Sequence, residues 1–178
     1  QSPTKGQARA LKRLGRYLIG RTRYVVMFRR QGEKVALHTH VDTNHAGCRM
    51  STSGGIIRLG KHTLRTWSLT QVVIALPSGE AEYYGMVKRV SFSLGTQSLL
   101  EDLGITAVIH MYTDSSAAKG IASRKGLGKV RHIEVNQLWL QDKVGSGTIT
   151  LTKVVGTDNH ADILTKHASA RVLASHLK

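Results

Sequence analysis

Apolar residues recur along this chain with two different periods, one typical of helices and one typical of strands. Residues 3–19 place Leu11, Leu14 and Leu18 on one stripe, which predicts a basic amphipathic helix. From residue 35 the period becomes two, which predicts a strand that ends at Asp42. One face of that strand carries Val35, Leu37, Thr39 and Val41, and the other carries Ala36, His38, His40 and Asp42.

The remaining pattern predicts further strands separated by helices. Apolar or alternating runs predict strands at 24–28, 54–60, 64–76, 106–113 and 148–155. Helical spacing predicts helices at 80–102, 115–123 and 133–144, and a last helix that starts near Asn159. After the N-terminal pieces, this order predicts an α/β fold with a five-stranded mixed sheet. We expect an antiparallel three-strand meander plus two parallel strands, flanked by helices.

Four acidic residues lie where strands end or helices begin: Asp42, Glu82, Asp114 and Asp162. Taken singly, each has an ordinary interpretation as a strand-end turn, a helix N-cap or a first-turn acid. Functional groups of such sheets gather at the carboxyl ends of parallel strands, so we expect the four to converge. Converging carboxylates repel one another unless cations lie between them, and oxygen ligands suit Mg²⁺. The pattern therefore predicts a metal site.

The charge of the chain points to a polyanionic partner. Lys and Arg number 26 against 11 Asp and Glu, so the formal net charge is +15. Clustered basic residues favour nucleic acid over the alternative of a basic structural protein. The single Cys48 excludes an internal disulfide, and no apolar run reaches membrane-spanning length. A soluble, intracellular protein is expected.

Six short motifs, in this order, carry a family resemblance: VDTNHAG, STSGG, SGEAEY, YTDSSAA, RHIEV and HADILTK. Over residues 35–168 the chain resembles the ribonuclease H domain of copia-type LTR retrotransposon polyproteins. The resemblance implies a ribonuclease H-like fold over residues 34–178. Residues 1–33, a basic helix and a short strand, look like a remnant of the preceding reverse transcriptase region.

The resemblance also implies a reaction, which is hydrolysis of the RNA strand of an RNA/DNA hybrid by a two-metal-ion mechanism. The implied catalytic and metal-binding residues are Asp42, Glu82, Asp114 and Asp162. Asp42 and Asp162 would hold the metal that activates water, and Asp42, Glu82 and Asp114 the metal beside the leaving oxygen. The implied cofactor is two Mg²⁺ ions, with Mn²⁺ as a substitute. The polymerase region of the same polyprotein is the expected partner, in cytoplasmic virus-like particles or the nucleus, with no membrane involved.

Contacts to the nucleic acid are expected in two places. Backbone and side chains of Ser78, Gly79 and Ser115 are expected near the RNA 2′ hydroxyl. The basic loop is expected to contact DNA phosphates through Arg124, Lys125, Lys129, Arg131 and His132. His160 lies two residues before Asp162, which suggests either an auxiliary role in product release or, as we favour, a helix-start residue.

The chain departs from the family pattern, and two other functions stay open. Asn44 and His45 stand where the family has an Asp and a Trp after the first acid, and Pro77 and Gly79 replace the commoner Ser and Thr. A zinc hydrolase is one alternative, because zinc accepts imidazole and thiolate ligands; its candidate ligands are His38, His40, Asp42, His45 and Cys48. The other is a non-catalytic nucleic-acid-binding module. Trp67 and Trp139 lie inside apolar patterns and are expected in the core.

Overall fold

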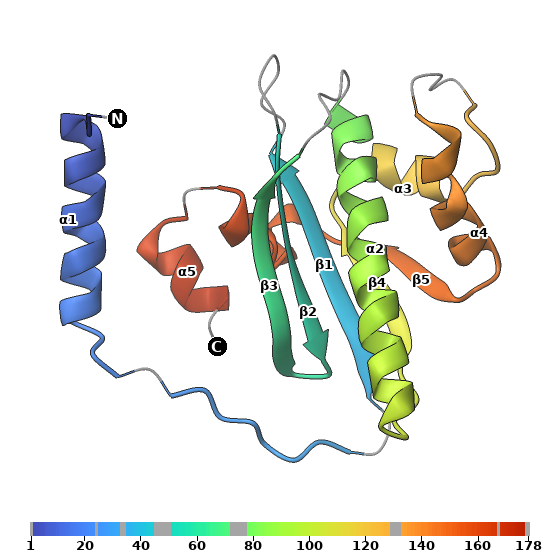
Figure 1. The fold of residues 1–178 in the computed structure, drawn as a ribbon, viewed down its shortest axis with the longest axis horizontal. Helices are drawn as coiled ribbons and strands as arrows, with labels where there is room; N and C mark the ends of the chain where they lie inside the picture. Colours follow the sequence, from blue (N-terminus) through green and yellow to red (C-terminus); the bar gives the residue numbers. More distant parts are fainter. Residues whose placement is uncertain are drawn as a thin grey trace. The chain divides into compact units, whose positions relative to one another are not determined.

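The chain folds as two compact units, Gln1–Arg30 and Gln31–Lys178. A computed structural model describes residues 2–23, 25–32, 35–44, 51–71, 78–128, 133–166 and 168–176. Figure 1 shows the helices and strands of both units in chain order. No helix of the described residues is long and apolar enough to span a bilayer.

The first unit contains helix α1 (Lys5–Ile19), so the predicted N-terminal helix is confirmed. A capping box begins it: the Thr4 backbone N–H donates to Gln7 Oε1 at 2.7 Å, and the Gln7 N–H donates to Thr4 Oγ1 at 3.3 Å. None of its residues is buried. The predicted strand at 24–28 is wrong, since the described residues 25–28 do not form a strand and their side chains are 60–67% exposed.

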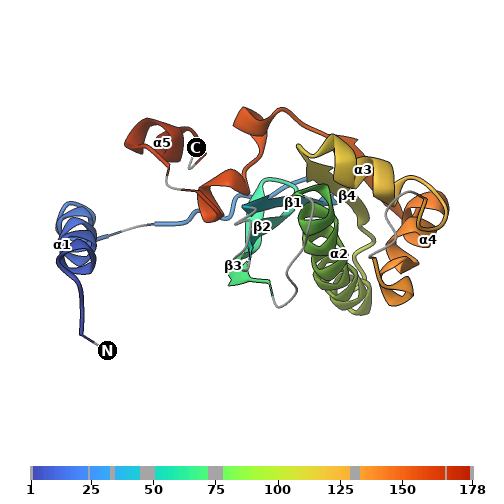
Figure 2. The same ribbon diagram turned by 90° about the horizontal axis from the view of Figure 1, so that it is seen from above.

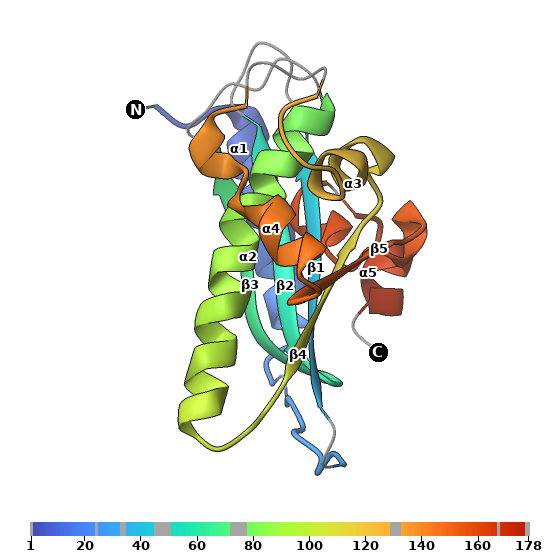
Figure 3. The ribbon, with the colours of Figure 1, turned by 90° about the vertical axis from the view of Figure 1, so that its right-hand side faces the viewer.

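The second unit is built on one five-stranded mixed sheet, as predicted. Its strands are β1 (Ala36–Asn44), β2 (Thr52–Leu59), β3 (His62–Thr70), β4 (Val108–Thr113) and β5 (Ile149–Lys153). They lie in the order β3-β2-β1-β4-β5. The pairs β1–β2 and β2–β3 are antiparallel, and the pairs β1–β4 and β4–β5 are parallel. Figure 3 shows this sheet beside the long helix α2.

Helices flank the sheet. They are α2 (Ser78–Asp102), α3 (Ser116–Ala122), α4 (Trp139–Gly145) and α5 (Ala170–His176), with 3₁₀ turns η1 (Val135–Gln137), η2 (Gly156–Asp158) and η3 (Asp162–Leu164). Figure 2 shows α2, α3 and α4 from above. The predicted helix at 133–144 is thus divided into η1 and α4.

The predicted helix starting near Asn159 is wrong, because a buried side chain fixes a turn there instead. Asn159 is fully buried, and its Nδ2 donates to the carbonyl of Val41 in β1 at 2.9 Å. Its Oδ1 accepts the Ala161 backbone N–H at 3.2 Å. Such side-chain hydrogen bonds to the backbone compete with helix formation. The chain forms η3 here, and the next helix starts only at Ala170.

The core lies between the sheet and α2. Leu37, Thr39 and Val41 of β1 are buried on this side, and Thr39 Oγ1 lies 2.8 Å from Ser93 Oγ of α2. The alternation predicted for β1 is therefore confirmed. Both tryptophans also behave as predicted, since Trp67 is buried in the core and Trp139 packs against it partly buried.

Candidate metal centre

Three of the four predicted acids converge at one end of the sheet. Asp42 of β1, Glu82 of α2 and Asp114 after β4 each offer a carboxylate oxygen, and these oxygens lie within 4.8 Å of one another. Since β1 and β4 are parallel neighbours, their carboxyl ends lie at the same edge, which brings the two aspartates together. α2 begins at Ser78, so Glu82 is in its second turn.

Close approach of α2 to the sheet places Glu82, and it depends on a glycine one turn further along. A Cβ at Gly85 would lie 2.6 Å from Thr43 Oγ1 and 3.2 Å from Ser53 Oγ. Those two hydroxyls are themselves 3.1 Å apart, where β1 and β2 pair. Only a residue without a side chain fits between the helix and these strands, so Gly85 determines how near Glu82 comes to Asp42.

The three carboxylates are electrostatically frustrated without a cation. Burial, followed by the charges of Asp42 and Asp114, raises the pKa of Glu82 to about 8. Burial also raises the pKa of Asp42, which is 2% exposed. Glu82 Oε2 and Asp114 Oδ1 are buried without a hydrogen-bond partner among the described residues. Clustered oxygens from three acids, two of which offer a buried oxygen without a partner among the described residues, fit a hard divalent cation such as Mg²⁺.

The fourth acid, Asp162, reaches this group through a lysine. Lys166 Nζ lies 3.0 Å from Asp162 Oδ1 and 3.5 Å from Asp42 Oδ1. Thr165 Oγ1 donates a hydrogen bond to the other oxygen of Asp42, Oδ2. Burial lowers the pKa of Lys166, but the hydrogen bond to Asp162 and the charge of Asp42 outweigh it and raise this pKa. Residues 165 and 166 therefore contact both oxygens of Asp42.

A glycine in β2 permits this arrangement. Gly54 is the strand partner of Asp42, and a Cβ there would lie 2.7 Å from Thr165 Cγ2 and 2.8 Å from Leu164 Cβ. The turn that carries Thr165 and Lys166 therefore lies directly on the β2 backbone. Sequence reasoning assigned no role to these two residues or to Gly54 and Gly85. The available signals were the glycines inside a strand and a helix pattern, and the Asp162–Lys166 spacing of four residues.

His160 lies in a cluster of aromatic rings on the sheet face that carries His38 and His40. Its ring forms an edge contact with His40 at 4.7 Å between centroids, and His160 Nδ1 lies 2.9 Å from His176 Nδ1. Our preferred interpretation of His160 as a helix-start residue is wrong, because it lies in the turn before η3. Burial, followed by the charge of Arg58, lowers the pKa of His160. An auxiliary role of His160 stays a prediction.

The described part of the chain contains no cluster of the histidine and cysteine ligands that the zinc alternative requires. Only the carboxylate trio forms a group of three potential ligands there. His38 Nδ1 instead lies 2.9 Å from the Tyr112 hydroxyl, and burial lowers the pKa of His40 to about 3. His45 and Cys48, the other ligands of that hypothesis, lie outside the described residues.

The residues predicted to contact the RNA strand lie where α2 and α3 begin. Ser115 caps α3, with its Oγ accepting the Ala118 N–H at 3.1 Å, so the N-cap of α3 is Ser115 rather than Asp114. Gly79 packs on α3, since a Cβ there would lie 2.5 Å from Ala117 Cβ. Ser78 begins α2.

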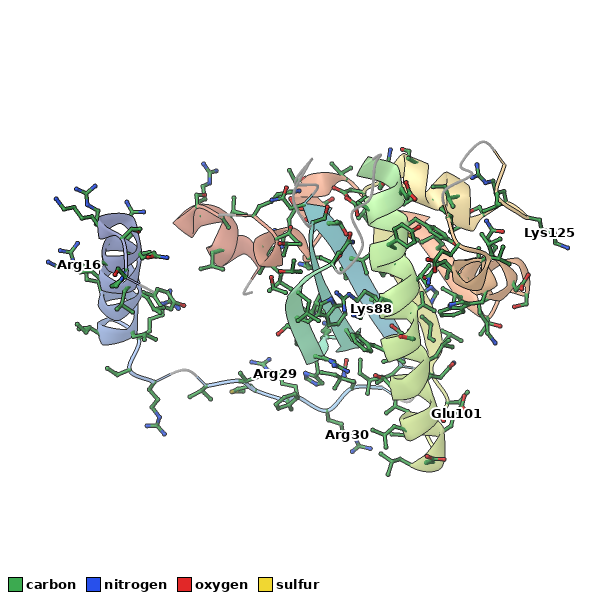
Figure 4. All side chains as sticks on the ribbon, turned by 45° about the horizontal axis from the view of Figure 1, so that its top comes forward. Arg16, Arg29, Arg30, Lys88, Glu101 and Lys125 are labelled. Atoms are coloured by element: carbon green, nitrogen blue, oxygen red, sulfur yellow. The ribbon has the colours of Figure 1, made fainter. Side chains whose placement is uncertain are left out.

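The basic loop is described only in part. Arg124 Nη2 donates to the Leu127 carbonyl at 2.5 Å, and Lys125 is exposed on the outside of the unit (Figure 4). Lys129, Arg131 and His132 lie outside the described residues. Whether any of these residues contacts nucleic acid stays a prediction.

Comparison with known proteins finds relatives among transposon polyproteins. No family model matches the sequence. The retrovirus-related Pol polyproteins from transposons RE1 and RE2 of Arabidopsis thaliana are each 32% identical over 94% of this chain. The polyprotein from transposon TNT 1-94 of Nicotiana tabacum is 26% identical over 93% of it. The chain spans only 12–13% of the length of these relatives.

Solved structures with the same fold are ribonucleases H. The ribonuclease H1 LC11, isolated from compost, matches 80% of this chain and 99% of its own with a TM-score of 0.50 and 17% identity. The structure of that enzyme in complex with an RNA/DNA hybrid matches 79% of this chain and 99% of its own, with a TM-score of 0.50 and 15% identity. At this identity the match establishes the fold alone.

Proposed function

We propose, from the premise that this chain is related to the Pol polyproteins of plant transposons and has a ribonuclease H fold, that it hydrolyses the RNA strand of RNA/DNA hybrids. The observation that supports this most directly is the convergence of Asp42, Glu82 and Asp114 at the carboxyl ends of β1 and β4. Three acids concentrated in a chain of net charge +15 suit a metal held against a phosphate.

Each acid has a distinct role in the proposed centre. Asp42, Glu82 and Asp114 hold one divalent ion, and Asp42 with Asp162 holds the second. When bound, two such ions supply Lewis acidity to an attacking water and to the leaving 3′ oxygen. Asp42 is shared, which agrees with its full burial and with the hydrogen bond from Thr165 that fixes its carboxylate. Mg²⁺ is the expected ion, with Mn²⁺ as a substitute.

The rest of the second unit holds the substrate. Ser78, Gly79 and Ser115 start helices beside the trio and are proposed to contact the 2′ hydroxyl that distinguishes RNA. Arg124, Lys125, Lys129, Arg131 and His132 are proposed to neutralise phosphates of the DNA strand. His160 is proposed only as an auxiliary group.

The boundary between domain and preceding region is proposed near residue 33. Residues 34–178 form the ribonuclease H domain, and residues 1–33 are the end of the reverse transcriptase region. The match to RE1 covers 94% of the chain and so extends into the first unit. On this proposal the polymerase part of the polyprotein is a partner, and the enzyme works in cytoplasmic virus-like particles or the nucleus.

Cleavage of end-labelled substrates tests the proposal. We expect the chain to cut the RNA of an RNA/DNA hybrid with Mg²⁺ or Mn²⁺, and to leave RNA duplex and DNA duplex intact. Asp42→Asn and Glu82→Gln are each expected to lower the cleavage rate by about a thousandfold or more, because the acids act as one unit. Asp142→Asn, which removes an exposed acid of α4, is the matched control and should cleave normally.

Two outcomes would replace this function by another. Tight hybrid binding by the wild-type chain without cleavage under any metal condition would leave a non-catalytic binding module. Stoichiometric zinc in the purified protein, retained by Asp42→Asn, would contradict the carboxylate centre.

A further inference from the structure

A lysine ammonium lies between the two acids proposed to hold the second metal ion. Lys166 Nζ is 3.0 Å from Asp162 Oδ1 and 3.5 Å from Asp42 Oδ1. Both distances are those of direct ion pairs, with the shorter one also a hydrogen bond. Lys166 thus makes, with its own charge, the bridge from Asp42 to Asp162 that a metal ion would make.

The two sides of Asp42 are therefore unequal. Toward Glu82 and Asp114, buried carboxylate oxygens have no hydrogen-bond partner among the described residues. Toward Asp162, the acid is already neutralised by Lys166. A divalent ion that binds beside Glu82 and Asp114 is attracted by carboxylates with no cation near them. A divalent ion that binds beside Asp162 is repelled by the positive charge of Lys166.

The lysine can leave this position, while the acids cannot. The Lys166 side chain is 48% exposed, against 2% for Asp42 and 26% for Asp162. Lys166 lies two residues after the end of η3, and its long, flexible side chain is half-exposed, so its ammonium can move without a change in the fold. Asp42, in contrast, is paired with Gly54 near the carboxyl end of β1 and is held by Thr165.

We propose that Lys166 is a built-in competitor for the second metal position, so that the ion at Asp42, Glu82 and Asp114 binds first and the ion at Asp42 and Asp162 binds only by displacing the lysine. This inference rests on the proposed two-ion function. Lys166 is a positioning residue on this view, because it keeps Asp42 and Asp162 together while the second ion is absent. Lys166 also makes the second metal ion bind more weakly than the first.

Mn²⁺ binding to the full chain tests this order directly. Free Mn²⁺ is measured by electron paramagnetic resonance during titration of wild type, Lys166→Met and Lys166→Arg. We expect two classes of site in the wild type, and in Lys166→Met a second site that is about tenfold tighter or more, because the ion no longer has to displace an ammonium from Asp42 and Asp162. Lys166→Arg keeps the charge and should keep the weak second site. The matched control is Lys143→Met, which removes an exposed charge from α4 and should change neither site.

Activity provides the second readout. The Mg²⁺ concentration for half-maximal cleavage should fall in Lys166→Met and stay unchanged in Lys143→Met. An unchanged or weaker second site in Lys166→Met, with circular dichroism showing an intact fold, would overturn the inference while leaving the nuclease assignment in place. Failure of the proposed function looks different: the wild type would bind no Mn²⁺ at Asp42 and would not cleave the hybrid.

Discussion

The two units of this chain differ in their charge and in whether they contain residues that could carry out a reaction. The first unit, Gln1–Arg30, holds nine of the 26 basic residues and none of the 11 acidic ones. The second unit holds every acid, and its net charge is only +6 of the total +15. The first unit has a helix with no buried residue, and the second contains the hydrophobic core and the carboxylate trio. Most of the excess charge, +9 of +15, therefore belongs to the unit that carries none of the acids.

The uneven distribution of charge between the units changes how the basic composition of the chain is interpreted. The net charge alone does not locate the cations, whereas the helical spacing of α1 places five of them on one face of that helix. Lys5, Arg9, Lys12, Arg13 and Arg16 recur at helical spacing opposite the stripe of Leu11, Leu14 and Leu18. Figure 4 shows Arg16, Arg29 and Arg30 projecting into solvent from this unit. If the first unit provides the electrostatic attraction of nucleic acid, substitutions can separate that attraction from the proposed cleavage at the carboxylate trio.

Of the effects that test this comparison of the two units, the largest is on hybrid affinity and comes from α1. The triple substitution Arg9→Gln, Arg13→Gln and Arg16→Gln keeps good helix formers at exposed positions. We expect hybrid affinity at low salt to fall by roughly ten- to a hundredfold, and the salt slope to decrease by about three, one for each lost phosphate contact. Fluorescence anisotropy over a salt series measures both. The cleavage rate at saturating substrate should not change; a large drop in that rate would show that the division between units is false.

The next largest expected effect is on the stability of the second unit and comes from substituting Gly85 in α2. Gly85→Ala introduces a Cβ that would lie 2.6 Å from Thr43 Oγ1, so we expect a loss of about 1–3 kcal/mol of stability from overpacking. Glu82 should move away from Asp42, and Mn²⁺ affinity should fall with it. Urea unfolding and Mn²⁺ titration measure the two changes.

Gly95→Ala in the same helix is the matched control. Apart from the backbone of α2 itself, no atom of the described residues lies within 4 Å of a Cβ at that position, so we expect a small gain in stability, up to about 1 kcal/mol, and unchanged Mn²⁺ binding. Equal effects of the two substitutions would contradict the close approach of α2 to the sheet as the cause.

The smallest expected effect is a pH dependence of stability in metal-free protein. The pKa of Glu82 is raised to about 8, mainly by burial, from an unfolded value near 4.5. The folded state therefore binds the proton more tightly, and this contribution to stability is full below the unfolded pKa and is lost as pH rises through about 8. We expect Tm without metal to decrease by a few degrees between pH 7 and 9.

Glu82→Gln isolates that contribution. The histidines with lowered pKa values, His38, His40 and His160, affect stability only at or below their ordinary pKa of 6.5, outside this window. The variant should show a flatter Tm between pH 7 and 9, and Mg²⁺ should restore Tm in the wild type but less in the variant. If Tm decreases with pH as steeply in Glu82→Gln as in the wild type, the pH dependence comes from another titrating group.

Local pattern was enough to predict the sheet and most of the centre, since both follow from period and strand direction. Alternation located β1, and the strand-end rule placed Asp42 beside Asp114. The position of Lys166 could not be obtained in this way. It depends on Asn159, whose hydrogen bond to Val41 joins residues 118 positions apart, and on the space above Gly54. Such long-range contacts have no signal in local periodicity, which is also why a regular helix was wrongly expected after residue 159.

The wide spacing of the site's residues along the chain has a consequence for biosynthesis. The hydroxyl of Thr165 and the carboxylate of Asp42 are 123 residues apart in sequence, and the side chains of His38 in β1 and Tyr112 in β4, which are also in contact, are 74 residues apart. Contacts of such separation form late and slowly, because loop closure must precede them. A chain still emerging from the ribosome has its first aspartate in place but lacks the turn that holds it. The centre is therefore completed only when the last part of the domain has been translated, and nascent fragments are expected to be inert toward nucleic acid.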